Sequence, residues 1–129
     1  MKLGCQDAFV ALAGQDFPRL VGFYQQLLER APQPLIPQIY AEFQLPGLRL
    51  AIFNPKAGRE FNGPSSGAMS VCLEVKNLDA AIAHVRQIEG STLSAMMTAS
   101  HGREIYLFDP AGNRLILHQT GAYSSRKDD

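Results

Sequence analysis

Apolar and polar positions alternate through residues 103–118 in the pattern of a β-hairpin. Side chains from 103 to 108, and again from 114 to 118, fall on alternate sides of an extended chain. Between these runs, Asp109 to Asn113 supplies a side-chain acceptor, a proline with fixed φ, and residues that tolerate positive φ. Both faces of the predicted strands carry apolar residues. Such a sheet has a helix on one face, and either a second sheet or a ligand cavity on the other.

Two segments have the apolar spacing of amphipathic helices. Asp16 is a suitable N-cap and Pro18 lies in the first turn, so we predict a helix over residues 17–30. Asn77 is a suitable cap for a second helix, whose apolar spacing continues until Gly90 provides a C-terminal cap.

Five further segments are predicted to be strands or extended chain. They are residues 8–13, 39–45, 48–53, 69–75 and 92–99. The second and third flank Pro46-Gly47, so they form a hairpin with a tight turn. The sequence therefore predicts an α+β protein.

The predicted elements occur twice in the same order. The helix caps Asp16 and Asn77 are 61 positions apart, and the turn glycines Gly47 and Gly112 are 65 positions apart. We therefore predict two βαβββ modules within one domain. The predicted boundaries are 1–121 for the domain, 7–54 for module one, 55–67 for the linker, 68–119 for module two and 122–129 for a polar tail.

Composition and charge narrow the class of protein. With 129 residues, 46% hydrophobic and 19% charged, the chain has the makeup of one globular domain. Its formal net charge is +0 and it has no basic stripe, so we expect no nucleic-acid partner. No apolar run reaches the roughly 20 residues of a membrane span, and no secretory signal is evident. We expect a cytoplasmic protein without a membrane partner, in which Cys5 and Cys72 are free thiols.

Three segments resemble the vicinal oxygen chelate superfamily, the group of glyoxalases, bleomycin resistance proteins and extradiol dioxygenases. They are FVALAGQDFPRLVGFYQQLLE at 9–29, SVCLEVKNLDAAIAHV at 70–85 and REIYLFDPAGNRLIL at 103–117. The FYxxLL helix and the DPxGN turn are the most specific parts of the match. The resemblance implies that the paired modules form a curled mixed sheet around a cavity. It also implies a homodimer, since closed two-fold dimers are the commonest assemblies.

Metal-using members of this superfamily hold a divalent ion with four strand positions. Here these positions match Phe9, Ala51, Ser70 and Ile116. Phenyl, methyl and sec-butyl groups have no donor atom, and a serine hydroxyl is a poor neutral one. We therefore predict no metal, no other cofactor, and no metal-dependent glyoxalase or dioxygenase activity.

In each predicted strand, every second side chain counted from those four positions points to the same face, and we expect these side chains to line the cavity. They are Phe9, Ala11, Ala13, Ala41, Phe43, Ala51, Phe53, Ser70, Cys72, Glu74, Glu104, Tyr106, Ile116 and His118. All but Ala13, Ala41 and Glu74 are our predicted ligand-binding residues. Most are apolar or small, with polar groups gathered in module two, which is the usual composition of a small-molecule pocket.

Three polar residues of this set have alternative interpretations. Tyr106 is a core aromatic or a ligand contact, and its hydroxyl needs a partner if it is buried. Glu104 lies at a solvent-exposed rim, or is a functional acid or base. His118 is a strand-end histidine bonded to a backbone carbonyl, or a group that titrates near the cavity. Cys72 is interpreted as a small buried hydrophobe.

Two functions remain open from the sequence. In the first, a metal-free protein like the bleomycin resistance proteins binds a small, largely apolar molecule in the sheet cavity. In the second, a metal-independent lyase, isomerase or hydrolase uses Glu104 or His118 as acid or base and Tyr106 as hydrogen-bond donor. The ionisable groups of the cavity discriminate between them, because proton transfer needs a well-placed base and sequestration does not.

Overall fold

The structure is a computed structural model that describes residues 4–55, 69–99 and 102–121. The chain divides into two compact units, residues 1–62 and 63–129, and each unit is described by itself. The predicted polar tail lies outside the described residues, as does the predicted linker except for Pro55. In the described part of the chain, no helix is both long enough and apolar enough to cross a membrane.

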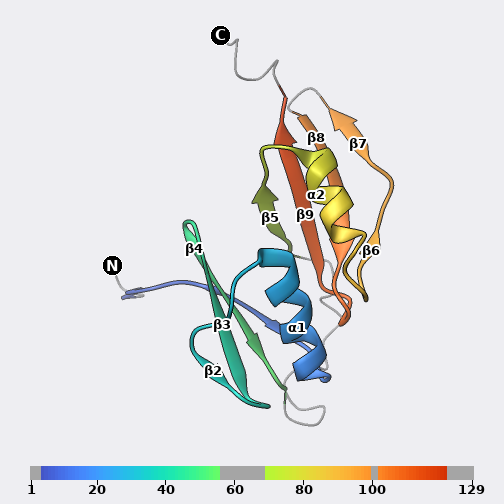
Figure 1. Cartoon of the computed structure of the whole chain (residues 1–129). Helices are drawn as coiled ribbons and strands as arrows, with labels where there is room; N and C mark the ends of the chain where they lie inside the picture. The colour runs from blue at the N-terminus through green and yellow to red at the C-terminus, as the bar shows by residue number, and fades with distance from the viewer. Residues whose placement is uncertain (1–3, 56–68, 100–101, 122–129) are drawn as a thin grey trace. The chain divides into compact units, whose positions relative to one another are not determined.

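The first unit is a four-stranded sheet with one helix (Figure 1). Its elements are β1 (Val10–Ala13), α1 (Phe17–Leu28), β2 (Leu35–Ile36), β3 (Tyr40–Leu45) and β4 (Leu48–Phe53). The strand order is β1-β4-β3-β2, with β1 parallel to β4 and the other neighbours antiparallel. The predicted hairpin around Pro46-Gly47 is confirmed.

The second unit repeats this arrangement. Its elements are β5 (Val71–Glu74), α2 (Leu78–Val85), β6 (Thr92–Leu93), β7 (Met97–Ala99), β8 (Gly102–Phe108) and β9 (Arg114–Thr120). The strand order is β5-β9-β8-β6, β7 also pairs with β8, and β5 runs parallel to β9. In each unit the first strand is therefore parallel to the last, so the predicted α+β fold of two related modules is confirmed.

Caps and turns follow the sequence signals. Asp16 Oδ1 accepts a hydrogen bond from the Arg19 amide at 3.4 Å, and Asn77 Oδ1 accepts from the Ala80 amide at 3.0 Å. Helix α1 ends earlier than predicted because Glu29 adopts a left-handed conformation with φ 56°. Helix α2 ends at Val85, and turns rather than helix continue the chain toward Gly90.

The turn between β8 and β9 is organised by one buried carboxylate. Asp109 is 4% exposed, and its Oδ1 accepts hydrogen bonds from the amides of Ala111 and Asn113, both at 2.9 Å. Its Oδ2 accepts from Asn113 Nδ2 at 2.8 Å. Gly112 has φ 89°, a conformation that glycine adopts without the strain a Cβ would impose. The side-chain acceptor predicted for this turn is therefore present.

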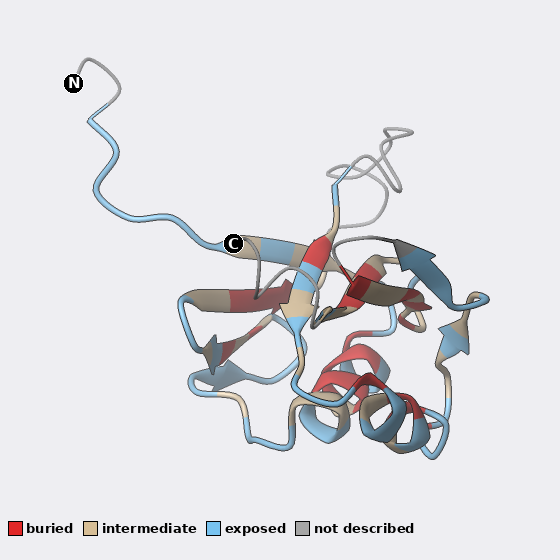
Figure 2. Cartoon of the chain, turned by 90° about the horizontal axis from the view of Figure 1, so that it is seen from above, coloured by how far each residue is buried: buried red, intermediate tan, exposed pale blue. Residues whose placement is uncertain are grey.

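Buried residues lie in both helices and in the strands of both sheets (Figure 2). In each sheet the large buried side chains point toward that sheet's own helix. In the first unit the Tyr24 ring of α1 lies 6.4 Å from the Phe43 ring of β3, centroid to centroid. In the second unit the Leu78 amide at the start of α2 donates to Gln119 Oε1 of β9 at 2.7 Å. In each sheet, the face that is turned away from the sheet's own helix is called the far face.

Candidate functional site

In the second sheet β9 lies between β8 and β5 (Figure 1). The far face of this sheet carries three cross-strand rows of side chains from these strands. The first row is charged, the second is largely apolar, and the third begins with an aromatic ring. From the first row to the third they are Glu104, His118 and Glu74; Tyr106, Ile116 and Cys72; and Phe108, Arg114 and Ser70. All seven residues of module two that we predicted to share a face do so.

The charged row contains a hydrogen-bonded histidine and carboxylate. Glu74 Oε1 lies 2.7 Å from His118 Nδ1, while Glu74 Oε2 accepts from the Thr120 amide at 2.8 Å and the Thr120 hydroxyl at 2.6 Å. The Thr120 hydroxyl, and then His118, hold the pKa of Glu74 below its usual value. When Glu74 is ionised it accepts a hydrogen bond from Nδ1–H of His118, and in that tautomer of the neutral ring Nε2 is the acceptor nitrogen. His118 therefore has the arrangement of an oriented base.

Cys72 in the middle row is not the buried hydrophobe that we predicted. The residue is exposed, because odd-numbered residues of β5 face α2 and Cys72 points to the far face. Desolvation of the sulfur raises the pKa of the thiol, and the charges of Glu74 and Glu104 raise it further. A thiol with a raised pKa stays protonated and is a weak nucleophile. Cys5 is also a free thiol.

Arg114 fixes two neighbours in the third and second rows. Its Nε donates to Ser70 Oγ at 2.6 Å, and its guanidinium lies 5.0 Å from the centre of the Tyr106 ring. Cation–π contacts of this kind restrain an aromatic ring without covering both of its faces. Tyr106 is half-buried, so the contact holds a ring that still has exposed area.

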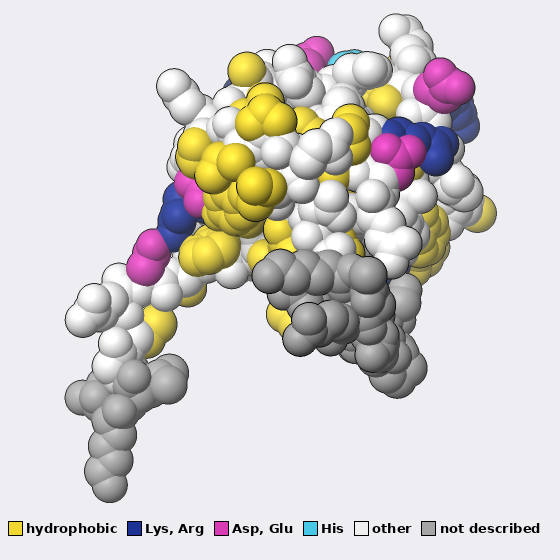
Figure 3. Space-filling view, turned by 90° about the horizontal axis from the view of Figure 1, so that it is seen from below, with side chains coloured by type: hydrophobic (Ala, Val, Ile, Leu, Met, Phe, Trp, Pro, Cys, Tyr) yellow, Lys and Arg dark blue, Asp and Glu magenta, His cyan; other side chains and the backbone are white. Residues whose placement is uncertain are grey.

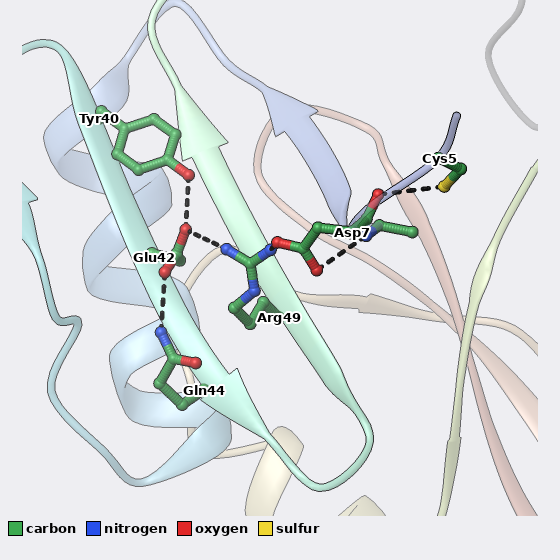
Figure 4. Close-up of polar contacts among 7 residues, drawn as sticks. Cys5, Asp7, Tyr40, Glu42, Gln44 and Arg49 are labelled. Carbon is green, nitrogen blue, oxygen red and sulfur yellow. Dashed lines mark hydrogen bonds and ion pairs between the residues drawn. The ribbon is translucent and has the colours of Figure 1, made fainter. Parts of the chain in front are cut away.

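The far face of the first sheet carries a network of hydrogen-bonded and ion-paired side chains (Figure 4). Glu42 accepts hydrogen bonds from the Tyr40 hydroxyl at 2.8 Å, Gln44 Nε2 at 2.9 Å and Arg49 Nη1 at 3.1 Å. Arg49 also pairs with Asp7, which precedes β1. The Tyr40 and Gln44 hydrogen bonds lower the pKa of Glu42, whereas burial and the bond to Glu42 raise that of Tyr40. These groups satisfy one another, so the network ties the segment before β1 to the sheet.

Two predicted cavity residues of the first module lie on the opposite face. Phe43 pairs with Leu50 and Ala41 with Ile52, and all four are buried on the face against α1. Our prediction for Phe43 and Ala41 was therefore wrong. The reason is the two-residue turn, which pairs Leu45 with Leu48 and so places even-numbered residues of β3 beside odd-numbered residues of β4.

The pairing of even-numbered residues of β3 with odd-numbered residues of β4 also explains why the sequence did not reveal Tyr40 and Glu42 as residues of the far face. Ala51 pairs with Ala11 and Glu42, and Phe53 pairs with Ala13 and Tyr40. The far face of this sheet therefore presents Tyr40 and Glu42 in place of Ala41 and Phe43. Counting outward from Pro46-Gly47 would have revealed this. The contact of Arg49 with the Phe9 ring, 4.6 Å from its centre, had no sequence signal.

The residues at the four metal-ligand positions do not fit a metal ion. Phe9 is 47% exposed and contacts Arg49, Ala51 is fully buried, and Ile116 lies in the apolar row. The Ser70 hydroxyl accepts the hydrogen bond from Arg114. Among the residues that the structure describes, no three His, Cys, Asp or Glu side chains are grouped so that they could hold a metal.

Comparisons of the sequence with known proteins give no match. No family model matches it. No curated protein matches it.

Comparison with solved structures identifies the fold. A glyoxalase-related enzyme from Fulvimarina pelagi has a TM-score of 0.73 at 20% identity, covering 92% of this chain and 94% of that one. The fosfomycin resistance protein FosX from Listeria monocytogenes, as a mutant complexed with Mn(II), has a TM-score of 0.73 at 15% identity, with 95% and 96% covered. A glyoxalase/bleomycin resistance protein from Catenulispora acidiphila has 0.67 at 22% identity, with 91% and 100% covered. These structures confirm the predicted fold, which is that of the glyoxalase and bleomycin resistance proteins.

Proposed function

We propose that this chain, which has the fold of the glyoxalase and bleomycin resistance proteins, binds a small, largely apolar molecule without a metal ion. The binding surface is the far face of the second sheet, defined by the three rows from Glu104 to Ser70. The observation that supports this proposal is the middle row. Tyr106 and Ile116 are half-buried and Cys72 is exposed, whereas their neighbours Ile105, Leu107, Leu115 and Leu117 are buried against α2.

A face of this composition suits a small ligand. The Tyr106 ring and the Ile116 side chain offer apolar area, and burying such area stabilises a complex by about 25 cal/mol per Å². The Tyr106 hydroxyl and the Glu104 carboxylate add polar contacts that orient a ligand. Fold alone does not assign function, so the proposal depends on these side chains and not on the resemblance.

The proposal predicts that compounds binding this face raise the melting temperature of the protein. A metabolite and antibiotic panel tested by thermal shift identifies them, because a ligand that binds only the native state stabilises it. Tyr106→Phe and Glu104→Gln should each weaken the binding of such a compound by about 0.5–3 kcal/mol, the effect of one hydrogen bond. Ala83→Ser, on the exposed side of α2, is the matched control. Unchanged affinity in both site variants would contradict the proposed surface.

The hydrogen bond between His118 and Glu74 favours a second candidate function. An imidazole oriented by a carboxylate is the usual form of a general base, and Tyr106 in the next row would serve as hydrogen-bond donor. The candidate activity is that of a metal-independent lyase, isomerase or hydrolase. A compound from the panel that is converted by the wild-type protein but not by His118→Asn would establish it, and a compound recovered unchanged supports binding alone.

We further propose that the protein forms a homodimer. Leu35, Ile36 and Ile39, in and after the short strand β2, are exposed by 49%, 47% and 59%, and Figure 3 shows apolar side chains gathered on the face viewed there. Exposed apolar groups of this kind mark association surfaces. Light scattering at micromolar concentration should give twice the 14.1 kDa chain mass, and Ile36→Lys should shift the mass toward the monomer. A wild-type monomer would contradict the proposal.

A further inference from the structure

We infer that the charged row makes this site selective for ligands that carry a positively charged nitrogen beside an apolar body. The inference rests on the proposed function and names the chemical class of its ligand. It follows from the order of the three rows along the strands, which places two carboxylates next to an apolar row.

The two carboxylates lie on either side of one imidazole. Glu104 of β8 and Glu74 of β5 are both direct cross-strand partners of His118 in β9. Direct partners have Cβ atoms about 4.5–5.5 Å apart, so the glutamates stand roughly 10 Å from each other across the row. An ammonium group above His118 would be within reach of both side chains.

The two glutamates differ in the number of hydrogen bonds that their carboxylates make within the described part of the protein. Both oxygens of Glu74 are engaged, one with His118 and the other with Thr120. The Glu104 side chain makes no hydrogen bond or ion pair with the residues that the structure describes, and it is half-buried. Glu104 is therefore the carboxylate that can accept hydrogen bonds from a ligand, while Glu74 adds charge and holds His118. Both charges act on Cys72, so their field extends over the middle row.

Arg114, which lies on the same face, is at the other end of β9 from the charged row. Arg114 is four residues from His118 along β9, about 13 Å at 3.3 Å per residue. Its Nε is bonded to Ser70 and its guanidinium contacts the Tyr106 ring. An anionic group placed at the charged row would meet two like charges, whereas an ammonium group would form charge-assisted hydrogen bonds. The apolar body of the same ligand would then extend over Tyr106 and Ile116.

Three probes of equal size test the inference: benzylamine, which is an ammonium ion at neutral pH, benzyl alcohol and benzoate. Each is titrated into the full-length ¹⁵N-labelled protein, and the amide shifts of β5, β8 and β9 are followed. We expect benzylammonium to bind about tenfold more tightly than benzyl alcohol, which is the scale of one charge-assisted hydrogen bond. Benzoate should bind most weakly.

Two variants assign the preference to Glu104. Glu104→Gln should weaken benzylammonium binding about tenfold and benzyl alcohol binding by much less. Glu89→Gln, an exposed substitution in the turn after α2, changes the net charge equally and should keep the wild-type preference. The same amide spectra report whether each variant is folded.

The outcomes separate the inference from the proposed function. Equal affinity for benzylammonium and benzyl alcohol, or tighter binding of benzoate, would overturn the inference and leave the binding surface in place. Equal effects of Glu104→Gln and Glu89→Gln on benzylammonium affinity would also overturn the inference and leave the binding surface in place. Shifts confined to amides outside β5, β8 and β9 would overturn the proposed surface itself.

Discussion

Replacing Phe43 by alanine should lower the free energy of unfolding by about 3–5 kcal/mol, the usual cost of removing a fully buried ring. Phe43 is 0% exposed, its ring lies against that of Tyr24, and its cross-strand partner Leu50 is 1% exposed. The surrounding side chains come from a sheet and a helix, so they cannot collapse fully into the space left. Urea unfolding of the wild-type and variant proteins measures the difference.

Phe53→Ala is the matched control because it deletes the same atoms from the other face of the same sheet. Phe53 is half-buried and pairs with Tyr40 and Ala13 on the far face. Its replacement should cost clearly less stability than that of Phe43. The reverse order would mean that the first sheet is paired one residue out of register, since a one-residue slip exchanges the two faces.

Replacing Asp109 by alanine should lower the free energy of unfolding by about 2–4 kcal/mol, because three donors lose a charged acceptor in a buried turn. The donors are the amides of Ala111 and Asn113 and the side chain of Asn113. These hydrogen bonds hold the turn of the hairpin that carries Tyr106 and His118, so their removal should also weaken ligand binding. Urea unfolding and the thermal-shift assay measure the two effects.

Two further substitutions show whether the buried carboxylate is responsible. Asp109→Asn keeps one acceptor oxygen and should have an intermediate effect. Asp16→Ala removes a carboxylate that caps α1 at an exposed position and should cost about 0.5–2 kcal/mol, as is usual for an N-cap. If Asp109→Ala cost no more than Asp16→Ala, the turn would not depend on this side chain.

Local signals in the sequence were sufficient for the caps and turns and for the hairpin of β8 and β9. Asp16, Asn77 and Asp109 are caps and turn acceptors that act within four residues of their own position, so their partners are known from spacing alone. The hairpin of β8 and β9 has one well-specified turn. The alternation along its strands was therefore enough to place Glu104, Tyr106, Ile116 and His118 on one face.

The first sheet shows where alternation alone is ambiguous. Alternation places Ala41 and Phe43 on one face of the strand and Tyr40 and Glu42 on the other. Each pair includes an aromatic side chain that could be buried in a core, so the pattern does not show which face is buried. The turn decides between them, because the number of residues in the loop sets which side chains lie opposite one another. That information was present in Pro46-Gly47, but it required the register of both strands rather than the pattern of one.

The sequence by itself determined the α+β class, the repeated modules, the caps and turns, and the shared face of β8 and β9, because each depends on residues close together along the chain. Only the tertiary structure decided which side chains touch. The bond between His118 and Glu74 spans 44 positions, that of Arg49 to Asp7 spans 42, and that of Arg114 to Ser70 spans 44. Such contacts depend on the register between a parallel strand pair and on rotamers set by neighbours, and neither has a local signature.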